Sequence, residues 1–241
     1  MREFFQRTED GSVVNIEVDM NAYAYSKKYS WLFSVFIKYE PSSETQEGYE
    51  EFLETKESLI IALEHDEKTK FVGIRIVDGW SEFYFYADDS KGLDATVAKM
   101  LNPSNYVYES NVVRDPKWDF HHKNLSPSDL ELASIESQKI IFLLEEEGDD
   151  LEKVRPVEHY VSFETPTQKN RFLSTLTLEG FTFKDEIESE EFANGLALMK
   201  DHSVTSQEVQ KEIENIFEAL KETKGYYEGW STVLANDIQE A

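Results

Sequence analysis

The sequence predicts an α+β protein made of two halves that share one order of elements: strand, helix, strand, strand, helix, strand. Three observations predict this fold class. Runs of aromatic and β-branched residues alternate with amphipathic helical patterns. The same order occurs once before residue 125 and again after residue 152. The length of 241 residues suits two domains of ordinary size.

A β-hairpin is predicted ahead of the first half, in residues 1–20. The runs EFFQR and VVNIEVD flank the turn EDGS, and both runs suit strands. Such a hairpin can extend the first sheet or cover its open face. The sequence leaves these two positions open.

The first half contains the complete order of elements. Residues 28–40 are rich in aromatic and β-branched side chains, as buried strands are. Asp78-Gly79 supplies the positive φ angles of a tight turn between the second and third strands. The predicted elements are strand 28–40, helix 48–66, strands 69–77 and 81–87, helix 91–101 and strand 106–114.

An acidic helix is predicted between the halves. Ser126 or Ser128 can cap its start and Gly148 can end it, while the run EEEGDD reads as a solvated boundary. We expect a first domain over 1–125, an acidic linker helix over 126–152 and a second domain over 153–241.

The second half repeats the order of the first. Pro166 suits the first position of a helix, and Gly180 and Gly225 suit helix ends. The predicted elements are strand 157–164, helix 165–180, strands 181–187 and 195–201, helix 203–225 and strand 226–235. This order is typical of ferredoxin-like domains. We therefore expect two ferredoxin-like βαββαβ domains with antiparallel sheets, joined by a helix, plus the N-terminal hairpin.

The charge balance restricts the partners. The chain has 49 acidic and 24 basic residues, and its formal net charge is -25. Because a polyanion repels phosphate groups, we expect no direct binding to nucleic acid or to anionic membranes. A basic surface of another protein is the favoured partner.

Cysteine usage and hydropathy indicate the compartment. The chain has no cysteine, which excludes disulfides, thiolate nucleophiles and cysteine-ligated metals. The start MREFFQRTEDG has no apolar core of a signal peptide, and no window reaches the roughly 18 apolar residues of a membrane span. We expect a cytoplasmic protein.

The second half resembles a known bacterial family. Its segments VEHYVSFET and LEGF, and GYYEGWST after a long amphipathic helix, are similar to the regulator of ribonuclease E activity B. That family usually ends in a Gly-x-Tyr-Asp-Gly-Trp-Glu run. Tyr227, Glu228, Gly229 and Trp230 match it with Glu in place of Asp, and Ser231 replaces the last acid.

The first half resembles the bacterial domain of unknown function 695. The likeness lies in GWSEFYFYADD, in DPKWDFHHKNLSPS and in the helix that begins near Tyr49. The second resemblance implies a ferredoxin-like domain that binds an endoribonuclease and restrains it without catalysis of its own. For the first half the resemblance implies no particular activity.

We therefore expect a non-catalytic acidic regulator that binds a ribonuclease or another RNA-turnover protein. The partner-binding candidates combine large amphipathic rings with an acid, as protein interfaces do. They are Tyr226, Tyr227, Glu228, Trp230 and His159. His159 shares a strand face with Val157 and Val161, which favours a satisfied core or rim histidine. For Trp230 the favoured interpretation is packing on the preceding helix.

An alternative function is a metal-assisted hydrolase with its site between the domains. Its candidate ligands are Asp115, Asp119, His121 and His122. Adjacent histidines on an extended segment point to opposite faces, so at most one of the pair can join Asp119. The favoured interpretation is a polar strand end with Trp118 and Phe120 packed inward. We expect no cofactor and no metal, and the sequence leaves the oligomeric state open.

An aromatic platform for RNA is a further alternative. Alternation places Trp80, Tyr84 and Tyr86 on one strand face, and single-strand RNA-binding modules stack bases on such rings. Glu82 lies between the rings, however, where those modules carry basic residues and glycines. We expect the tyrosines to pack against the N-terminal hairpin or the other domain.

Overall fold

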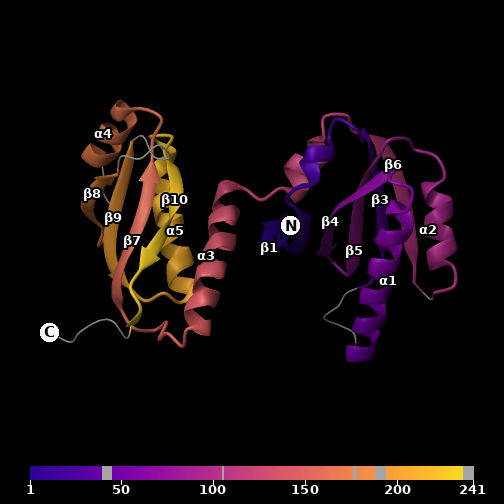
Figure 1. Ribbon diagram of the computed structural model, residues 1–241, viewed down its shortest axis with the longest axis horizontal. Coiled ribbons are helices and arrows are strands. Elements are labelled where there is room, and N and C mark those ends of the chain that lie inside the picture. The colour runs from indigo at the N-terminus through magenta and orange to yellow at the C-terminus, as the bar shows by residue number, and fades with distance from the viewer. Residues whose placement is uncertain (40–44, 105, 176–177, 188–193, 236–241) are drawn as a thin grey trace. The chain divides into compact units, whose positions relative to one another are not determined.

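The computed structural model describes residues 1–39, 45–104, 106–175, 178–187 and 194–235. The chain forms two compact units, Met1–Ser126 and Pro127–Ala241, which we call unit 1 and unit 2 (Figure 1). Unit 1 contains an antiparallel sheet of six strands, and unit 2 contains an antiparallel sheet of four. The predicted α+β class is confirmed.

The N-terminal hairpin extends the sheet of unit 1. The strand order is β1-β2-β4-β5-β3-β6, and β2 pairs with β4 in a register that places Ile16 opposite Arg75. The hairpin therefore takes the first of the two positions that the sequence leaves open. The strands are β1 (Arg2–Glu9), β2 (Ser12–Asp19), β3 (Trp31–Ile37), β4 (Thr69–Val77), β5 (Trp80–Ala87) and β6 (Tyr108–Arg114).

Two helices pack on one face of the unit 1 sheet. Helix α1 (Gln46–Glu64) begins at Thr45, whose side chain accepts a hydrogen bond from the Gly48 amide. Phe52 of α1 stacks on Tyr39 with 3.9 Å between ring centroids, and Val97 of α2 (Leu93–Leu101) belongs to the same buried cluster. From the strands this cluster contains Phe33, Val35, Ile37, Phe71, Ile74, Phe83 and Phe85.

The opposite face of this sheet is covered by irregular segments. A short 3-10 helix, η1 (Ala22–Tyr25), lies on one part, and residues 115–126 lie on another. Trp118 is fully buried, stacks on Tyr86 with 3.8 Å between ring centroids, and donates its Nε1 hydrogen to the carbonyl of Tyr29 over 2.8 Å. The inward packing of Trp118 agrees with the favoured interpretation of this segment.

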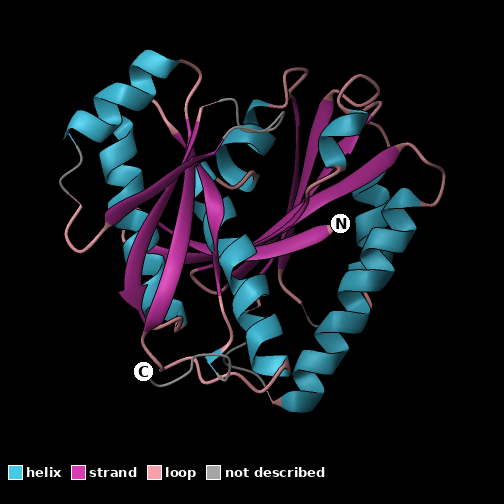
Figure 2. Cartoon of the chain, turned by 60° about the vertical axis from the view of Figure 1, so that its left-hand side comes forward, coloured by secondary structure: helices cyan, strands magenta, loops and turns pink. Residues whose placement is uncertain are grey.

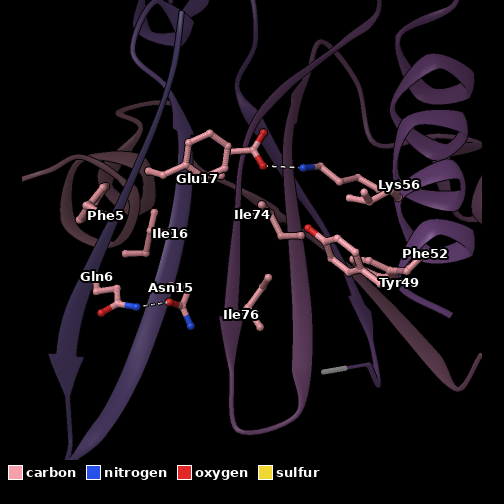
Figure 3. A pocket seen from close by; sticks show the side chains of 12 residues that line it. Phe5, Gln6, Asn15, Ile16, Glu17, Tyr49, Phe52, Lys56, Ile74 and Ile76 are labelled. Carbon is pink, nitrogen blue, oxygen red and sulfur yellow. Dashed lines mark hydrogen bonds and ion pairs between the residues drawn. The ribbon is translucent and has the colours of Figure 1, made fainter. Parts of the chain in front are cut away.

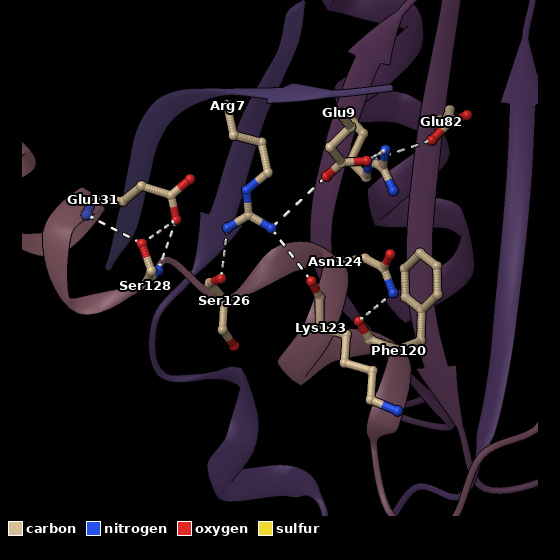
Figure 4. Close-up of polar contacts among 10 residues, drawn as sticks. Arg7, Glu9, Glu82, Phe120, Lys123, Asn124, Ser126, Ser128 and Glu131 are labelled. Carbon is tan, nitrogen blue, oxygen red and sulfur yellow. Dashed lines mark hydrogen bonds and ion pairs between the residues drawn. The ribbon is translucent and has the colours of Figure 1, made fainter. Parts of the chain in front are cut away.

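The backbone of residues 115–126 differs from the expected strand end. Strand β6 ends at Arg114, and His121–Leu125 form one π-helical turn, η3. Arg7 of β1 ties this turn to the sheet by donating to the carbonyls of Lys123 (3.3 Å) and Ser126 (2.9 Å) (Figure 4). A long-range contact of this kind has no signature in the local sequence.

Unit 2 is built in the same way around a smaller sheet. Its strand order is β10-β7-β9-β8, with β7 (Arg155–Ser162), β8 (Thr182–Ile187), β9 (Gly195–His202) and β10 (Tyr226–Thr232). Helices α4 (Pro166–Thr175) and α5 (Ser206–Lys221) carry apolar residues that are buried with Val161, Leu196 and Leu198 of the sheet. Figure 2 shows the helices and strands of the chain in separate colours. The predicted helix end at Gly180 is wrong, because residues 178–180 are not helical.

The helix expected as a linker belongs to the core of unit 2. Helix α3 (Asp129–Glu146) begins with a capping box in which Ser128 and Glu131 bond each other's backbone amides (Figure 4). Ile141 of α3 is buried in one cluster with Val157 and Trp230. Its apolar side explains this packing, because an amphipathic helix buries its apolar stripe on the nearest core.

No helix among the described residues combines the length and the apolar character needed to cross a bilayer.

Candidate functional site

Strand β10 contains four of the five predicted partner-binding residues, Tyr226, Tyr227, Glu228 and Trp230. This edge strand pairs with β7 in a register that places Tyr226 opposite Ser162 and Trp230 opposite His159. A β-bulge lies between Tyr227 and Gly229, and the φ angle of Gly229 is +122°. Glycine adopts such an angle without a steric penalty, so Gly229 permits the bulge at this position.

The bulge decides which residues of β10 face the helices. Tyr227 and Trp230 both point to the helix side although they lie three positions apart, which regular alternation would not allow. Trp230 is 5% exposed, and its Nε1 donates to the Ser137 hydroxyl of α3 over 3.0 Å. Trp230 therefore fastens α3 to the sheet.

A chain of polar side chains crosses the core of unit 2. The Tyr227 hydroxyl lies 2.9 Å from Nδ1 of His159, and Nε2 of His159 lies 3.0 Å from Nε2 of His202. Nδ1 of His202 lies 2.7 Å from the carbonyl of Ser203. A carbonyl only accepts, so His202 carries its hydrogen on Nδ1, His159 donates from Nε2, and Tyr227 donates to His159.

Tyr227, His159 and His202 are all neutral at physiological pH. Burial lowers the pKa of His159 to about 3, and the nearby His202 adds to the effect. Burial also lowers the pKa of His202 and raises the pKa of Tyr227. These three side chains form a buried network in which every hydrogen-bonding group described above has a partner. The network holds β10, β7 and β9 together.

The exposed face of the same sheet carries tyrosines and carboxylates. The register of β7 and β10 puts Glu158, Tyr160, Ser162, Tyr226 and Ser231 on this face, and hydrogen bonds to Tyr226 and Ser162 bring Glu164 and Glu228 to it. We call these seven residues the acidic tyrosine face, in which Ser162 is buried. These residues alternate with Val157, His159 and Val161, which are buried against the helices.

Hydroxyl groups hold the carboxylates of this face in place. The Tyr226 hydroxyl donates to Glu164 over 2.8 Å, and the Ser162 hydroxyl donates to Glu228. The Tyr160 hydroxyl lies 2.7 Å from the Ser231 hydroxyl.

Only one basic residue is paired with the acidic tyrosine face among the described residues. Lys184 of β8 forms an ion pair with Glu158. The carboxylates of Glu164 and Glu228 have hydroxyl partners and no cationic partner among the described residues. The face therefore presents two aromatic rings beside uncompensated negative charge, an arrangement that suits arginine side chains.

The structure separates the five predicted partner-binding residues into two groups. Tyr226 and Glu228 are exposed on the acidic tyrosine face. Tyr227, Trp230 and His159 lie on the helix side of the sheet, where Tyr227 is half-buried and the other two are buried. The assignment of all five residues to partner binding stays a prediction.

Five further residues of the face were not among the predicted candidates: Glu158, Tyr160, Ser162, Glu164 and Ser231. Glu158, Tyr160 and Glu164 share one side of the β7 segment, and this alternation is visible in the sequence. The register between β7 and β10 is what places these residues beside Tyr226 and Glu228.

The predicted metal-ligand candidates do not converge. The Asp115 carboxylate accepts from the Tyr86 hydroxyl over 2.6 Å, whereas His122 packs against the Tyr23 ring with 4.6 Å between centroids. His121 is 4% exposed, and burial lowers its pKa to about 4. The described residues contain no group of three or more His, Asp or Glu side chains placed to hold a metal ion.

The aromatic platform considered for RNA is not accessible. Tyr84 and Tyr86 are 4% and 0% exposed. Their rings lie against Phe120 and Trp118, with centroid distances of 4.4 and 3.8 Å. The cover comes from residues 115–126, whereas β2 of the hairpin lies in the same sheet and adds Val14, Ile16 and Val18 to the same buried cluster. The tyrosines therefore share a core with the hairpin but are not covered by it.

Each of the two parts of the chain matches the model of a protein family. Residues 3–126 match the model of a family of unknown function (DUF695), and this match covers 124 of the 241 residues. The chain belongs to this family. Residues 134–232 match the model described as regulator of ribonuclease activity B. Both resemblances drawn from the sequence are confirmed, and the second match begins inside α3.

No curated protein matches the chain. A solved structure described as an unknown protein from Galdieria sulphuraria is 10% identical and covers 86% of this chain and 99% of its own, with a TM-score of 0.21. A likeness of this size supports no conclusion about fold or function.

Proposed function

We propose that this protein is a non-catalytic regulator that binds a ribonuclease, or another protein of RNA turnover, through the acidic tyrosine face of unit 2. The observation that carries the proposal is the combination of Tyr160 and Tyr226 with carboxylates that have no cationic partner among the described residues. The match of residues 134–232 to a regulator of ribonuclease activity supports it.

The chemistry of this face suits a basic partner. A guanidinium group can stack on a tyrosine ring and pair at the same time with a neighbouring carboxylate. The ring of Tyr226 and the carboxylate of Glu164 already lie side by side, because the Tyr226 hydroxyl donates a hydrogen bond to Glu164. A ribonuclease surface that binds RNA is rich in such cations, so the regulator competes with RNA for it.

The charge of the whole chain acts at longer range. A net charge of -25 attracts a basic surface before contact and increases the association rate. The attraction falls with ionic strength, because the Debye length shortens from about 30 Å at 0.01 M salt to about 10 Å at 0.1 M. The proposed inhibition is therefore weakened by salt.

Three further expectations belong to this proposal. We infer a ferredoxin-like arrangement for both units, which the matching orders β6-β3-β5-β4 and β10-β7-β9-β8 support. The partner is taken to be an endoribonuclease in the cytoplasm. The functional division into 1–125, 126–152 and 153–241 also stays a proposal, although α3 packs in the core of unit 2.

The test uses the full chain and purified bacterial ribonuclease E. Cleavage of a short fluorescent RNA is measured at low ionic strength against increasing regulator concentration. We expect the wild-type chain to slow cleavage. The double variant Glu164→Gln/Glu228→Gln keeps the hydrogen-bond acceptors but removes two charges, and should raise the half-inhibitory concentration at least about tenfold, which corresponds to about 1.4 kcal/mol.

The matched control changes the same number of charges elsewhere. Glu51→Gln/Glu54→Gln lies on the exposed side of α1 in unit 1 and should change the half-inhibitory concentration less than about twofold. A wild-type chain that neither binds nor slows the nuclease contradicts the proposal. Equal losses in both double variants would assign the effect to net charge and exclude a specific face.

A further inference from the structure

Unit 1 contains a trough that the proposed function does not use. It lies between the β1–β2 hairpin and helix α1, above strand β4, and its volume is about 500 Å³ (Figure 3). Volumes of about 300 to 1,000 Å³ are typical of small-molecule sites. We propose that this trough binds an uncharged, flat aromatic molecule that carries a carboxamide or lactam group.

The walls and floor of the trough are apolar. Phe4 of β1 is 68% exposed and Tyr49 of α1 is 43% exposed, and both line the trough with Leu53, which is 37% exposed. Ile74 and Ile76 of β4 form the floor (Figure 3). Large apolar side chains gathered around one exposed hollow are typical of ligand sites, because a ligand removes their surface from water.

The charges at one end of the trough cancel. Glu17 is 4% exposed, and its carboxylate accepts from Nζ of Lys56 at 2.5 Å and from Nη1 of Arg2 at 3.1 Å. Arg2 also lies 3.5 Å from the Glu57 carboxylate. Two cations face two carboxylates, so no net charge is left for a charged ligand to pair with. A charged ligand would lose its hydration without compensation.

An amide pair at the other end supplies the specificity. The Gln6 and Asn15 side chains are joined by one hydrogen bond of 2.7 Å (Figure 3). Whichever amide donates, one carbonyl oxygen and one amino group stay available, and the described residues provide no other side-chain partner for them. A donor beside an acceptor matches the edge of a carboxamide or lactam, which presents the complementary pair.

A third polar group lies on the α1 side. The hydroxyl of Tyr49 has no hydrogen-bond partner among the described residues, and Figure 3 shows its oxygen directed toward Ile74 on the floor. A flat ring between Phe4 and Tyr49 would contact both aromatic walls while its amide reaches Gln6 and Asn15. The ligand class follows from these three features together.

The test is an NMR titration of the full chain with ¹³C-labelled isoleucine methyl groups. The Ile74 and Ile76 methyls report on the trough, and the Ile213 methyl reports on the core of unit 2. Nicotinamide is the carboxamide probe and uracil is the lactam probe. We expect saturable shifts of Ile74 and Ile76 with a Kd in about the millimolar range, and no shift of Ile213.

Nicotinate tests the requirement for an uncharged ligand, because it has the same ring with a carboxylate. It should bind at least about tenfold more weakly than nicotinamide. Binding of only one of the two amide probes would identify its group, carboxamide or lactam, as the one that the trough recognises. Absence of saturable shifts with both probes, or equal binding of nicotinate, overturns the proposal.

Exposed variants test the residues without threatening the fold. Gln6→Leu should weaken nicotinamide at least about fivefold and leave the binding of phenol, which lacks the amide, within about twofold. Phe4→Ala should weaken both, whereas Phe183→Ala, an exposed phenylalanine of unit 2, should change neither. Because Phe4 and Gln6 lie on an edge strand and are exposed, the Ile16 methyl should keep its native shift. Unchanged nicotinamide binding by Gln6→Leu contradicts the assignment.

Discussion

At the scale of single residues, the core of unit 2 depends on two neutral histidines. His159 is 0% exposed, and all of its ring nitrogens have partners, Tyr227 on one side and His202 on the other. The two rings cannot both be protonated, because each would then carry a hydrogen in the contact between their Nε2 atoms. Burial accordingly lowers the pKa of His159 to about 3, below the ordinary histidine value of about 6.5.

The depressed pKa predicts a loss of stability in mild acid. Between pH about 3 and 6.5 the unfolded chain binds a proton at His159 and the folded chain does not, so stability rises with pH in this window. From pH 7 to pH 5 the free energy of unfolding of unit 2 should fall by about 2 kcal/mol on account of His159. Urea unfolding, followed through the amide NMR peaks of β7 and β9, measures this loss.

The matched variants for this prediction are His159→Leu and His65→Leu. His159→Leu should reduce the pH dependence by about the same 2 kcal/mol. His65 follows α1 in unit 1, so its replacement should leave the pH dependence of unit 2 unchanged. An identical pH dependence in His159→Leu and the wild type would show that His159 is not held neutral.

At the scale of elements, the sheet of unit 1 is closed by a segment without regular strand or long helix. Residues 115–126 cover Tyr84 and Tyr86, which would otherwise be an exposed aromatic surface. Trp118 has a φ angle of +58°, an unfavourable conformation for a large residue. Its stacking on Tyr86 and its bond to the Tyr29 carbonyl offset that cost.

Trp118 should therefore dominate the stability of this cover. Trp118→Ala should lower the free energy of unfolding of unit 1 by about 3 to 5 kcal/mol, because it empties a fully buried site. Trp118→Phe keeps most of the ring and leaves the Tyr29 carbonyl without its donor, so it should cost less, about 1 to 3 kcal/mol. Chemical unfolding measures both, and equal stability of Trp118→Ala and wild type would contradict the role of the cover.

At the scale of the whole molecule, the two units have separate cores. The buried clusters of unit 1 contain residues of unit 1 only, and those of unit 2 contain residues of unit 2 only. Helix α3 lies on the unit 2 side of this division, because Ile141 and Ser137 contact the core and Trp230. The family match that begins at residue 134 includes most of this helix.

The separate cores predict separate folding. Fragments 1–126 and 127–241 should each unfold in one cooperative transition, measured by circular dichroism in urea. Fragment 153–241 lacks α3 and should be less stable than 127–241 by at least about 3 kcal/mol, since it exposes Trp230 and leaves its Nε1 without Ser137. Equal stability of these two fragments would restore the linker interpretation of α3.

Several features could be predicted because they are local. The alternation in 157–164 identified which side of that strand is buried, and the Asp78-Gly79 pair identified a hairpin turn. The predicted helix over 165–180 is too long, because residues 178–180 are not helical. The roles of Trp118 and Arg7 could not be predicted, because their partners, the Tyr29 carbonyl and the carbonyls of Lys123 and Ser126, are distant in sequence.

Element order, the apolar side of each strand and helix, and the acidic charge all follow from the sequence, because periodicity and composition are properties of neighbouring residues. The acidic tyrosine face, the neutral histidine pair and the trough above β4 depend instead on register and on packing between distant segments. Such contacts form only when burial of apolar surface outweighs the entropy of closing long loops, so they are decided by the folded chain as a whole.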